Sequence, residues 1–411
     1  MNKTKTAIIT GKDPKYNNDT DGANVLITNM AVALSSKGPV DIYTPIGYSG
    51  HAYSRKKAMS QLLEREIFSD NVTIIRFPVT KLFTSEHTAP GSTYLDRVAI
   101  SFAEADYFSQ GLLQKYDLVQ INHMAHTFGI ILKDYVPKDR VVVFPMMLGN
   151  FYKLFTSVAP EYICLEQKVL QQIHHIQSPS YAEQNVLLHD YFVSPDKVIV
   201  TPRGYDPTVF KPKYRAGVNN KTIEIVSGNM VRPQKGQKSF IGIAKEARRR
   251  GFDLKINLAG VASTSYSKQY NLYSQELIEE IKENDLEESF VFHGILTQSE
   301  LAELMNKSHI AVVPSITETF GKFPLECVVS GLPTIVYNDV PAFQEFLVNQ
   351  QTGLTVPRTA EDTVDAIEQL VGNNKLYSHI SREGINSAND FTWDNVIKEL
   401  LKEYKIRGII K

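Results

Sequence analysis

Two glutamates, separated by seven residues, stand where a buried strand is expected to run into a helix. They are Glu318 and Glu326, and the apolar run Ile310 to Val313 precedes them. Pro324 suits the first helical position, where its missing amide hydrogen is no loss, so we expect a short helix that begins beside Lys322. The amino end of a helix binds anions, because its first backbone amides have no partner inside the helix.

The backbone around this helix start could hold a phosphate, and the two glutamates could hold hydroxyl groups. Amides of Phe320, Gly321 and Lys322 would point at the anion, and Gly321 lets the chain approach closely. A carboxylate beside a phosphate is costly unless it accepts hydrogen bonds, and the hydroxyls of a ribose and a sugar are suitable donors. This combination describes a nucleotide sugar. The alternative is that Glu326 caps its own helix and Glu318 is solvated.

The same segment resembles the signature of the retaining glycosyltransferases of family 4 type, which have the GT-B fold. That signature reads E-x-F-G, then P-L-E, then G-x-P, and every part of it is present in residues 318–333. Glu345 and the run Gly353 to Pro357 are similar to the family's further glutamate and its G-L-x-V-P strand. The run Gly228 to Gly236 resembles the donor loop G-R-x-x-x-x-x-K-G, which puts Lys235 on a diphosphate.

Two more segments extend the resemblance toward the amino end. Pro202 to Asp206, with Phe210 and Pro212, is similar to the family's P-N-G-x-D…F-x-P linker. Asp19 to Ala23 resembles the D-T-G-G-Q loop of the branch that contains sucrose and sucrose-phosphate synthases and inositol-phosphate glycosyltransferases. The resemblance implies an α/β chain of GT-B type, with two doubly wound Rossmann-like domains that face a central cleft.

The activity that this resemblance implies is the transfer of a hexose or N-acetylhexosamine, with retention, from a nucleotide diphosphate sugar to an acceptor hydroxyl. A uridine diphosphate donor is favoured over a guanosine diphosphate donor. The acceptor attacks on the face of the leaving group, so the protein positions the reactants and stabilises the departing diphosphate. Lys235 and the amides near Gly321 would hold the diphosphate, Glu326 the ribose and Glu318 the sugar hydroxyls.

The residues expected in the site fall into three groups. Catalytic roles are assigned to Lys235, Glu318 and His123. Donor binding is assigned to Gly22, Asn229, Arg232, Lys235, Glu318, Phe320, Gly321, Lys322 and Glu326. Acceptor binding is assigned to Asp21, Asn122, His126 and Lys153. Neither a metal nor a cofactor is expected, and the triplet Asp19-Thr20-Asp21 is interpreted as a glycine-bounded loop.

Several positions depart from the family pattern. Asn229 stands where the donor loop has an arginine, and Arg232 is a candidate to replace its charge. The family's histidine falls at Asn122, with His123 and His126 beside it, and the sequence leaves open which of the three faces the cleft. These departures motivate a second hypothesis, a catalytically silent relative that serves as a partner or glycan-binding subunit of another glycosyltransferase. A third, a nucleotide-sugar epimerase or a phosphorylase, fits the motif less well.

Alternating elements must position these residues. Short β-branched runs alternate with amphipathic stretches, first up to about residue 200 and again from Ile223 onward, which predicts two units with parallel sheets. Proline and glycine gather between them. We expect an amino-terminal acceptor domain over residues 1–205, a nucleotide-sugar domain over 206–385, and a terminal helical segment, 386–411, that can pack back on the first domain.

Composition narrows the remaining possibilities. The chain has 411 residues, with 44 Lys and Arg against 45 Asp and Glu, so no excess of basic charge marks a nucleic-acid binder. Two cysteines cannot build a disulfide framework. No run reads as a signal peptide or a membrane span, so we expect a cytoplasmic protein whose peripheral contact with a membrane stays open. Its partners are expected to be a nucleotide-sugar donor and a carbohydrate or small hydroxylated acceptor.

Overall fold

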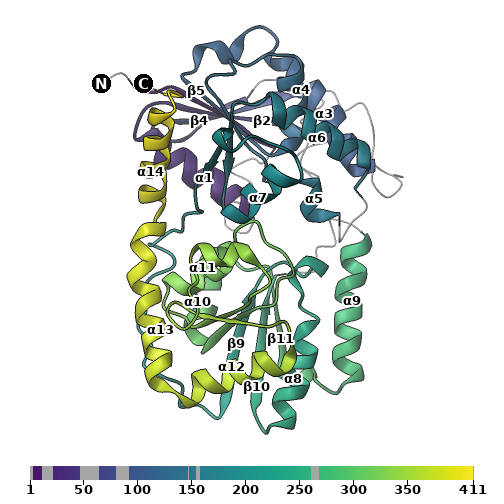
Figure 1. The fold of residues 1–411 in the computed structure, drawn as a ribbon, viewed down its shortest axis with the longest axis vertical. Helices are drawn as coiled ribbons and strands as arrows, with labels where there is room; N and C mark the ends of the chain where they lie inside the picture. The colour runs from purple at the N-terminus through teal and green to yellow at the C-terminus, as the bar shows by residue number, and fades with distance from the viewer. Residues whose placement is uncertain are drawn as a thin grey trace. The chain divides into compact units, whose positions relative to one another are not determined.

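The computed structural model describes residues 3–11, 22–46, 64–79, 92–146, 148–153, 158–260 and 268–410. The chain divides into two compact units (Figure 1). Unit 1 holds Met1–Pro202 and Trp393–Lys411, and unit 2 holds Arg203–Thr392. The first crossing therefore lies three residues before the expected boundary at residue 205, and the chain returns to unit 1 seven residues after the expected position, 386.

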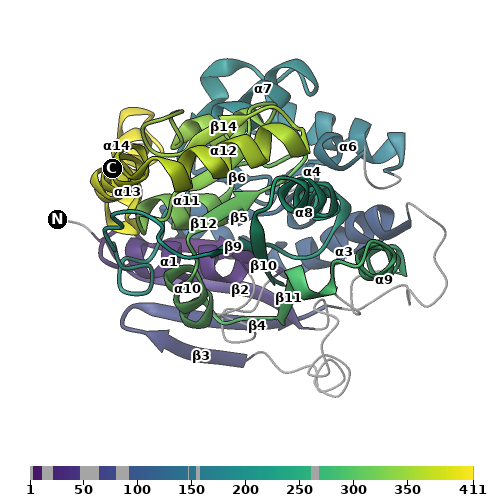
Figure 2. The ribbon, with the colours of Figure 1, turned by 90° about the horizontal axis from the view of Figure 1, so that it is seen from below.

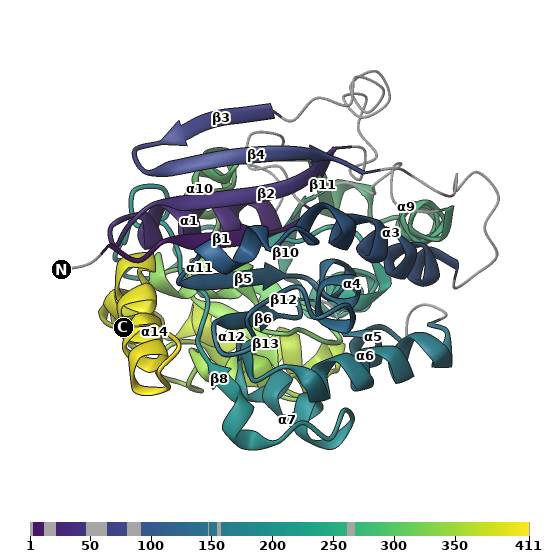
Figure 3. The same ribbon diagram turned by 90° about the horizontal axis from the view of Figure 1, so that it is seen from above.

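The described part of unit 1 forms an eight-stranded sheet in the order β3-β4-β2-β1-β5-β6-β7-β8. Figure 3 shows the part of this order from β3 to β6. The strands are β1 (Thr6–Ile9), β2 (Val40–Ile46), β3 (Glu64–Ser69), β4 (Val72–Pro78), β5 (Leu118–Asn122), β6 (Val141–Phe144), β7 (His175–Ser178) and β8 (Val198–Val200). Neighbouring strands are parallel, apart from β3, which runs antiparallel to β4. Helices on both faces bury the apolar strands, as a parallel sheet requires.

Two apolar cores lie on opposite faces of this sheet. One core joins β-strand side chains to α3 (Ser92–Phe108), α4 (Phe128–Leu132), α6 (Pro160–Gln172) and α7 (Tyr181–His189). The other joins alternate strand residues to α1 (Gly22–Ser35) and α14 (Trp393–Ile406). Short helices complete the unit: η2 (Leu112–Lys115), η3 (Met124–His126), α5 (Gly149–Tyr152) and η4 (Pro195–Lys197).

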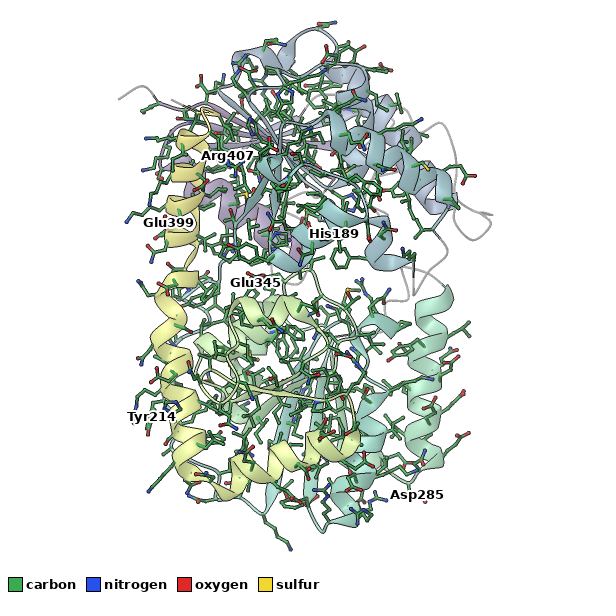
Figure 4. The ribbon with its side chains drawn as sticks, viewed as in Figure 1. His189, Tyr214, Asp285, Glu345, Glu399 and Arg407 are labelled. Carbon is green, nitrogen blue, oxygen red and sulfur yellow. The ribbon has the colours of Figure 1, made fainter. Side chains whose placement is uncertain are left out.

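The carboxyl-terminal helix α14 is part of unit 1. Its apolar stripe packs into the core that α1 lines, and Tyr404 OH donates a hydrogen bond to Gln177 Oε1 at 3.2 Å. Arg407, labelled in Figure 4, follows the helix and donates to Val198 O at 3.1 Å. An amphipathic helix with these contacts covers a sheet face that would otherwise be open.

The described part of unit 2 forms a six-stranded parallel sheet in the order β11-β10-β9-β12-β13-β14 (Figure 2). Its strands are β9 (Thr222–Gly228), β10 (Asp253–Ala259), β11 (Phe290–Gly294), β12 (Ile310–Val313), β13 (Thr334–Tyr337) and β14 (Leu354–Val356). Its helices are η5 (Pro233–Lys235), α8 (Ser239–Arg249), α9 (Lys268–Glu283), η6 (Glu287–Ser289), α10 (Gln298–Lys307), α11 (Lys322–Val329), η7 (Pro341–Glu345), α12 (Ala360–Gly372), α13 (Asn374–Ser387) and η8 (Ala388–Phe391). Both units thus have the doubly wound architecture that places ligands at the carboxyl ends of the strands. No helix among the described residues combines the length and apolar character needed to span a membrane.

Candidate functional site

The candidate donor site lies in unit 2, at the carboxyl ends of the adjacent parallel strands β9 and β12. Ile225 pairs with Ile310, so the two strands end at the same edge of the sheet. After β9 the chain turns through η5 and reaches Gly236, whose φ is +66°. After β12 it enters the loop that carries Glu318 and then α11. Both motifs that the sequence singled out therefore start at one sheet edge.

The two loops are joined by backbone contacts. Ile316 N donates a hydrogen bond to Gln234 O at 2.8 Å. A Cβ atom on Gly236 would lie 2.1 Å from Pro314 O, so only glycine fits this approach. Gly236 thus allows the two loops to pack closely. This packing fixes the backbone position from which the Lys235 side chain projects.

Lys235 and Glu318 meet at this junction, although 83 positions separate them in sequence. Lys235 Nζ lies 2.5 Å from Glu318 Oε1, and the side chains are 21% and 10% exposed. Ser315 Oγ donates a second hydrogen bond to the same oxygen at 2.9 Å. Ser315 was not among the residues expected in the site, and its only signal was its place three residues before Glu318 in the turn.

A second lysine–glutamate pair stands at the start of α11. Lys322 Nζ lies 2.7 Å from Glu326 Oε1, one helical turn away. Glu326 is 3% exposed, and this burial raises its pKa above the ordinary value, although the Lys322 ammonium opposes the shift. A nearly buried carboxylate with one cationic neighbour is costly to keep ionised. Glu326 is therefore a candidate functional residue rather than a residue that stabilises the fold.

Gly321 precedes the first residue of α11, but Pro324 does not occupy the expected first helical position. Gly321 caps the helix with φ +98°, and a Cβ atom there would lie 2.7 Å from the Phe343 ring. The helix starts at Lys322, so Pro324 occupies its third position rather than its first. At the third position proline still lacks only an amide that no helical carbonyl could reach. Glu326 consequently lies in the second turn.

The other expected donor residues take different places around these loops. Phe320 is 1% exposed and packs against Phe346, with ring centroids 5.2 Å apart, so its side chain belongs to the core of unit 2. Among the described residues, Asn229 Nδ2 is buried without a hydrogen-bond partner. Arg232 is partly buried and its guanidinium donates to Met230 Sδ. Glu345, labelled in Figure 4, ends η7.

Three of the residues expected in unit 1 lie at the end of β5 and just after it: Asn122 and His126, expected to bind the acceptor, and His123, expected to be catalytic. Asn122 and His126 are 1% and 2% exposed, whereas His123 keeps part of its surface. His126 Nδ1 lies 2.7 Å from Oε2 of the buried Glu104, and Gln120 Nε2 donates to Asn122 Oδ1 at 3.2 Å. Asn122 and His126 thus help to build the interior of unit 1. His123 is the residue of the three that a ligand could reach.

The backbone of His123 is itself unusual. Its φ is +84°, a left-handed value that costs a residue with a side chain about 1–3 kcal/mol. The peptide is held there because His123 N donates to Phe144 O at 2.7 Å, and Thr127 Oγ1 donates to His123 O at 3.1 Å. Such enforced conformations occur at functional sites more often than elsewhere.

The remaining expected residues of unit 1 are less informative. Gly22 begins α1, and Lys153 is exposed directly after α5. Asp21 and the triplet Asp19-Thr20-Asp21 lie outside the described residues. Within the described ranges, no three His, Cys, Asp or Glu side chains come together as they would at a metal site.

Comparison with protein families assigns one part of the chain directly. The family model described as "Glycosyl transferases group 1" matches residues 211–387, a stretch that lies wholly within unit 2. Residues 211–387 are a group 1 glycosyltransferase domain. This domain contains Lys235, Glu318, Lys322 and Glu326, the two ion pairs described above.

Curated relatives and a solved structure extend the comparison of the glycosyltransferase domain to the rest of the chain. A D-inositol 3-phosphate glycosyltransferase of Paenarthrobacter aurescens is 26% identical over 247 residues, which cover 58% of this chain and 59% of the relative. The chain spans a little over half the length of this relative and of other D-inositol 3-phosphate glycosyltransferases that it matches. The mannosylfructose-phosphate synthase of Agrobacterium fabrum is 22% identical over 93% of this chain and 86% of its own. The solved sucrose-phosphate synthase of Thermosynechococcus elongatus superimposes with a TM-score of 0.78 over 98% of both chains, at 17% identity. The chain therefore has the GT-B fold.

Proposed function

We propose that this protein is a retaining glycosyltransferase that moves a hexose or N-acetylhexosamine from a nucleotide diphosphate sugar to an acceptor hydroxyl. One observation carries the proposal: Lys235 and Glu318, from two loops of the group 1 glycosyltransferase domain, meet at 2.5 Å where the strands end. A cation and a carboxylate at this edge supply what a donor needs, namely a partner for its phosphates and an acceptor for its sugar hydroxyls.

The two ion pairs suggest how the donor is held. Each of these two lysines is paired with a glutamate, Lys235 with Glu318 and Lys322 with Glu326. A diphosphate that approaches the start of α11 would compete for the ammonium of Lys235, because phosphate oxygens are strong charged acceptors. The two carboxylates would then accept hydrogen bonds from the sugar and the ribose.

The chemical step in this proposal needs positioning and charge stabilisation. The bond from the anomeric carbon to the diphosphate oxygen breaks while the acceptor oxygen attacks from the same face, and the proton of the acceptor hydroxyl passes to the departing diphosphate oxygen. Lys235 stabilises the negative charge that grows on this leaving group. No protein nucleophile enters this step. His123, which is half-buried in the loop after β5, is the candidate residue of unit 1 to contact the acceptor.

The proposed donor carries uridine diphosphate in preference to guanosine diphosphate, as the resemblance to the sucrose-phosphate synthase branch implies, and no metal takes part. The acceptor is a hydroxylated small molecule or carbohydrate. The names of both curated relatives include a phosphate, so a phosphorylated acceptor is one candidate. Acceptors with and without phosphate therefore belong in the same assay.

The test is a transfer assay with nucleotide sugars and a panel of acceptors. The purified protein is incubated with each pair in the presence of a chelator, released nucleoside diphosphate is measured, and the product's anomeric configuration is read from its proton coupling by nuclear magnetic resonance. We expect turnover with an unchanged anomeric configuration. An inverted product would refute retention, and a requirement for divalent metal would refute the metal-independent step. Donor binding without turnover for any acceptor would instead support a catalytically silent relative.

A further inference from the structure

Arg358 lies just beyond the last glycosyltransferase-like segment of the sequence, yet it reaches the loop that carries Glu318. The residue follows β14, while the loop follows β12, and β13 lies between the two strands in the sheet. The carboxyl ends of these three parallel strands share one edge. A long side chain after β14 can therefore span β13 and touch the loop after β12.

The guanidinium of Arg358 is held in place by Asp339 and Tyr337, which follow and end β13. Arg358 Nε donates to Asp339 Oδ2 at 2.8 Å, and Nη2 donates to Asp339 Oδ1 at 2.6 Å. Its central carbon lies 4.4 Å from the centroid of the Tyr337 ring. A bidentate ion pair with a carboxylate, together with an aromatic ring face, fixes both the position and the plane of a guanidinium.

The same guanidinium binds the backbone of the Glu318 loop. Arg358 Nη1 donates to Pro314 O at 3.2 Å, and Nη2 donates to Ser315 O at 3.0 Å. Ser315 is completely buried, and its hydroxyl donates to Glu318 Oε1 at 2.9 Å. One residue, Ser315, is thus bound through its carbonyl by Arg358 and binds the Glu318 carboxylate through its side chain.

Lysine could not replace these contacts. The ammonium of lysine carries all its donors on one nitrogen, whereas the planar guanidinium reaches Asp339 on one side and two carbonyls on the other. Loss of the fork would leave the carbonyls of Pro314 and Ser315 without this donor and would loosen the segment between β12 and Glu318. A misplacement of about 1 Å in a reacting geometry costs a large factor in rate, even when binding persists.

We propose that Arg358 is a positioning residue that holds the Glu318 carboxylate in its catalytic place through Ser315. The inference rests on the proposed glycosyltransferase function, and it adds a residue that lies outside every motif of the signature. A second arginine of the same unit, Arg250, provides a control that distinguishes a role in the site from a role in stability. Arg250 pairs with Asp365 and Glu246 on the helical surface of unit 2.

The experiment compares Arg358→Lys with Arg250→Lys in the full-length protein. We expect Arg358→Lys to lower kcat about tenfold or more, with KM for the donor changed less than threefold, because the site is displaced rather than lost. Arg250→Lys is expected to match the wild type. In a Ser315→Ala background, Arg358→Lys should cost less than about twofold, since the link it acts through is already broken. Equal costs in both backgrounds, or equal kinetics of the two lysine variants, would overturn the proposal.

A second measurement does not depend on turnover. Hydrogen exchange of the peptide that covers residues 314–319 includes the Ile316 amide, which is bonded to Gln234 O. We expect exchange there to be faster in Arg358→Lys by about tenfold, and unchanged in Arg250→Lys. If the wild type turns over no nucleotide sugar, the proposed function fails while this readout still decides the positioning. Unchanged exchange in Arg358→Lys would refute it.

Discussion

Replacement of Glu326 by glutamine should separate function from stability. The carboxylate is 3% exposed, with Lys322 Nζ 2.7 Å away, and glutamine keeps its size while removing its charge. The proposed role, accepting hydrogen bonds from the ribose hydroxyls, depends on that charge. Burial of the same charge costs free energy of folding, because the folded protein removes the carboxylate from water. The variant should therefore bind the donor less tightly without being less stable.

The loss in donor affinity follows from the charge that is removed. Glutamine can still accept a neutral hydrogen bond, which contributes about 0.5–1.5 kcal/mol, whereas a bond to a charged group contributes about 1.5–3 kcal/mol. The difference of about 1–1.5 kcal/mol corresponds to a Kd increase of about 5- to 13-fold. Calorimetric titration with the donor nucleotide measures this change directly. An unchanged donor Kd in Glu326→Gln would remove Glu326 from the site.

The effect on stability depends on pH, and its sign follows from the pKa. Burial raises the pKa of Glu326 in the folded protein above its ordinary value of 4.5, so the folded state binds this proton more tightly than the unfolded state. The wild type should therefore lose stability relative to Glu326→Gln as the pH rises from 4.5 through the raised pKa. At neutral pH the variant should be at least as stable as the wild type.

Glu246 offers a control of opposite sign in the same unit. Hydrogen bonds from Arg249 and Arg250 lower its pKa to about 2, so the ionised form stabilises the fold at neutral pH and this contribution is lost on acidification. Glu246→Gln should weaken the fold without changing donor affinity. Because the chain forms two units, stability is best read from hydrogen exchange of the amides of α11 and α8, compared at equal pH. Equal protection changes in the two variants would refute this reasoning.

Three further changes test other parts of the site. Lys235→Ala should lower kcat about 100-fold, as expected for a group that stabilises a leaving anion. Lys238, which forms ion pairs with Glu276 and Glu280, supplies the control, and equal kinetics of Lys235→Ala and Lys238→Ala would contradict this role. Gly236→Ala should destabilise the loop by more than the ~1–2 kcal/mol that a left-handed φ alone costs, because its Cβ would also lie 2.1 Å from Pro314 O. The variant should also have a lower kcat, and wild-type loop exchange and kcat would argue against this. His123→Ala should raise the acceptor KM or lower kcat while donor Kd stays constant, and weakened donor binding alone would move His123 to the donor side.

Most strands could be predicted because their apolar residues are continuous. Runs such as Ala7 to Ile9 and Ile310 to Val313 lie inside β1 and β12. The antiparallel edge strand β3, with the sequence EREIFS, was missed, since a half-exposed edge needs no apolar pattern. Apolar residues recur at helical spacing from Asp96 to Lys115, yet this stretch is divided between α3 and η2, because Gly111 adopts φ +73° before η2 begins.

The site could be predicted where a motif fixes the backbone, and not where tertiary packing decides. Glycine and lysine spacing located the two loops, but the contact of Lys235 with Glu318 depends on β9 and β12 being neighbours. The choice among Asn122, His123 and His126 depends on burial. His126 is buried against Glu104, which lies 22 positions earlier in the sequence, and no local sequence pattern predicts such a contact.

The most direct measurement is a calorimetric titration of the folded protein with uridine, guanosine and adenosine diphosphates and their sugar conjugates, in parallel with Glu326→Gln. We expect saturable binding of one nucleoside diphosphate, with uridine diphosphate favoured, and a Kd that rises about 5- to 13-fold in the variant. Failure of the wild type to bind any of these compounds would contradict a donor site in unit 2.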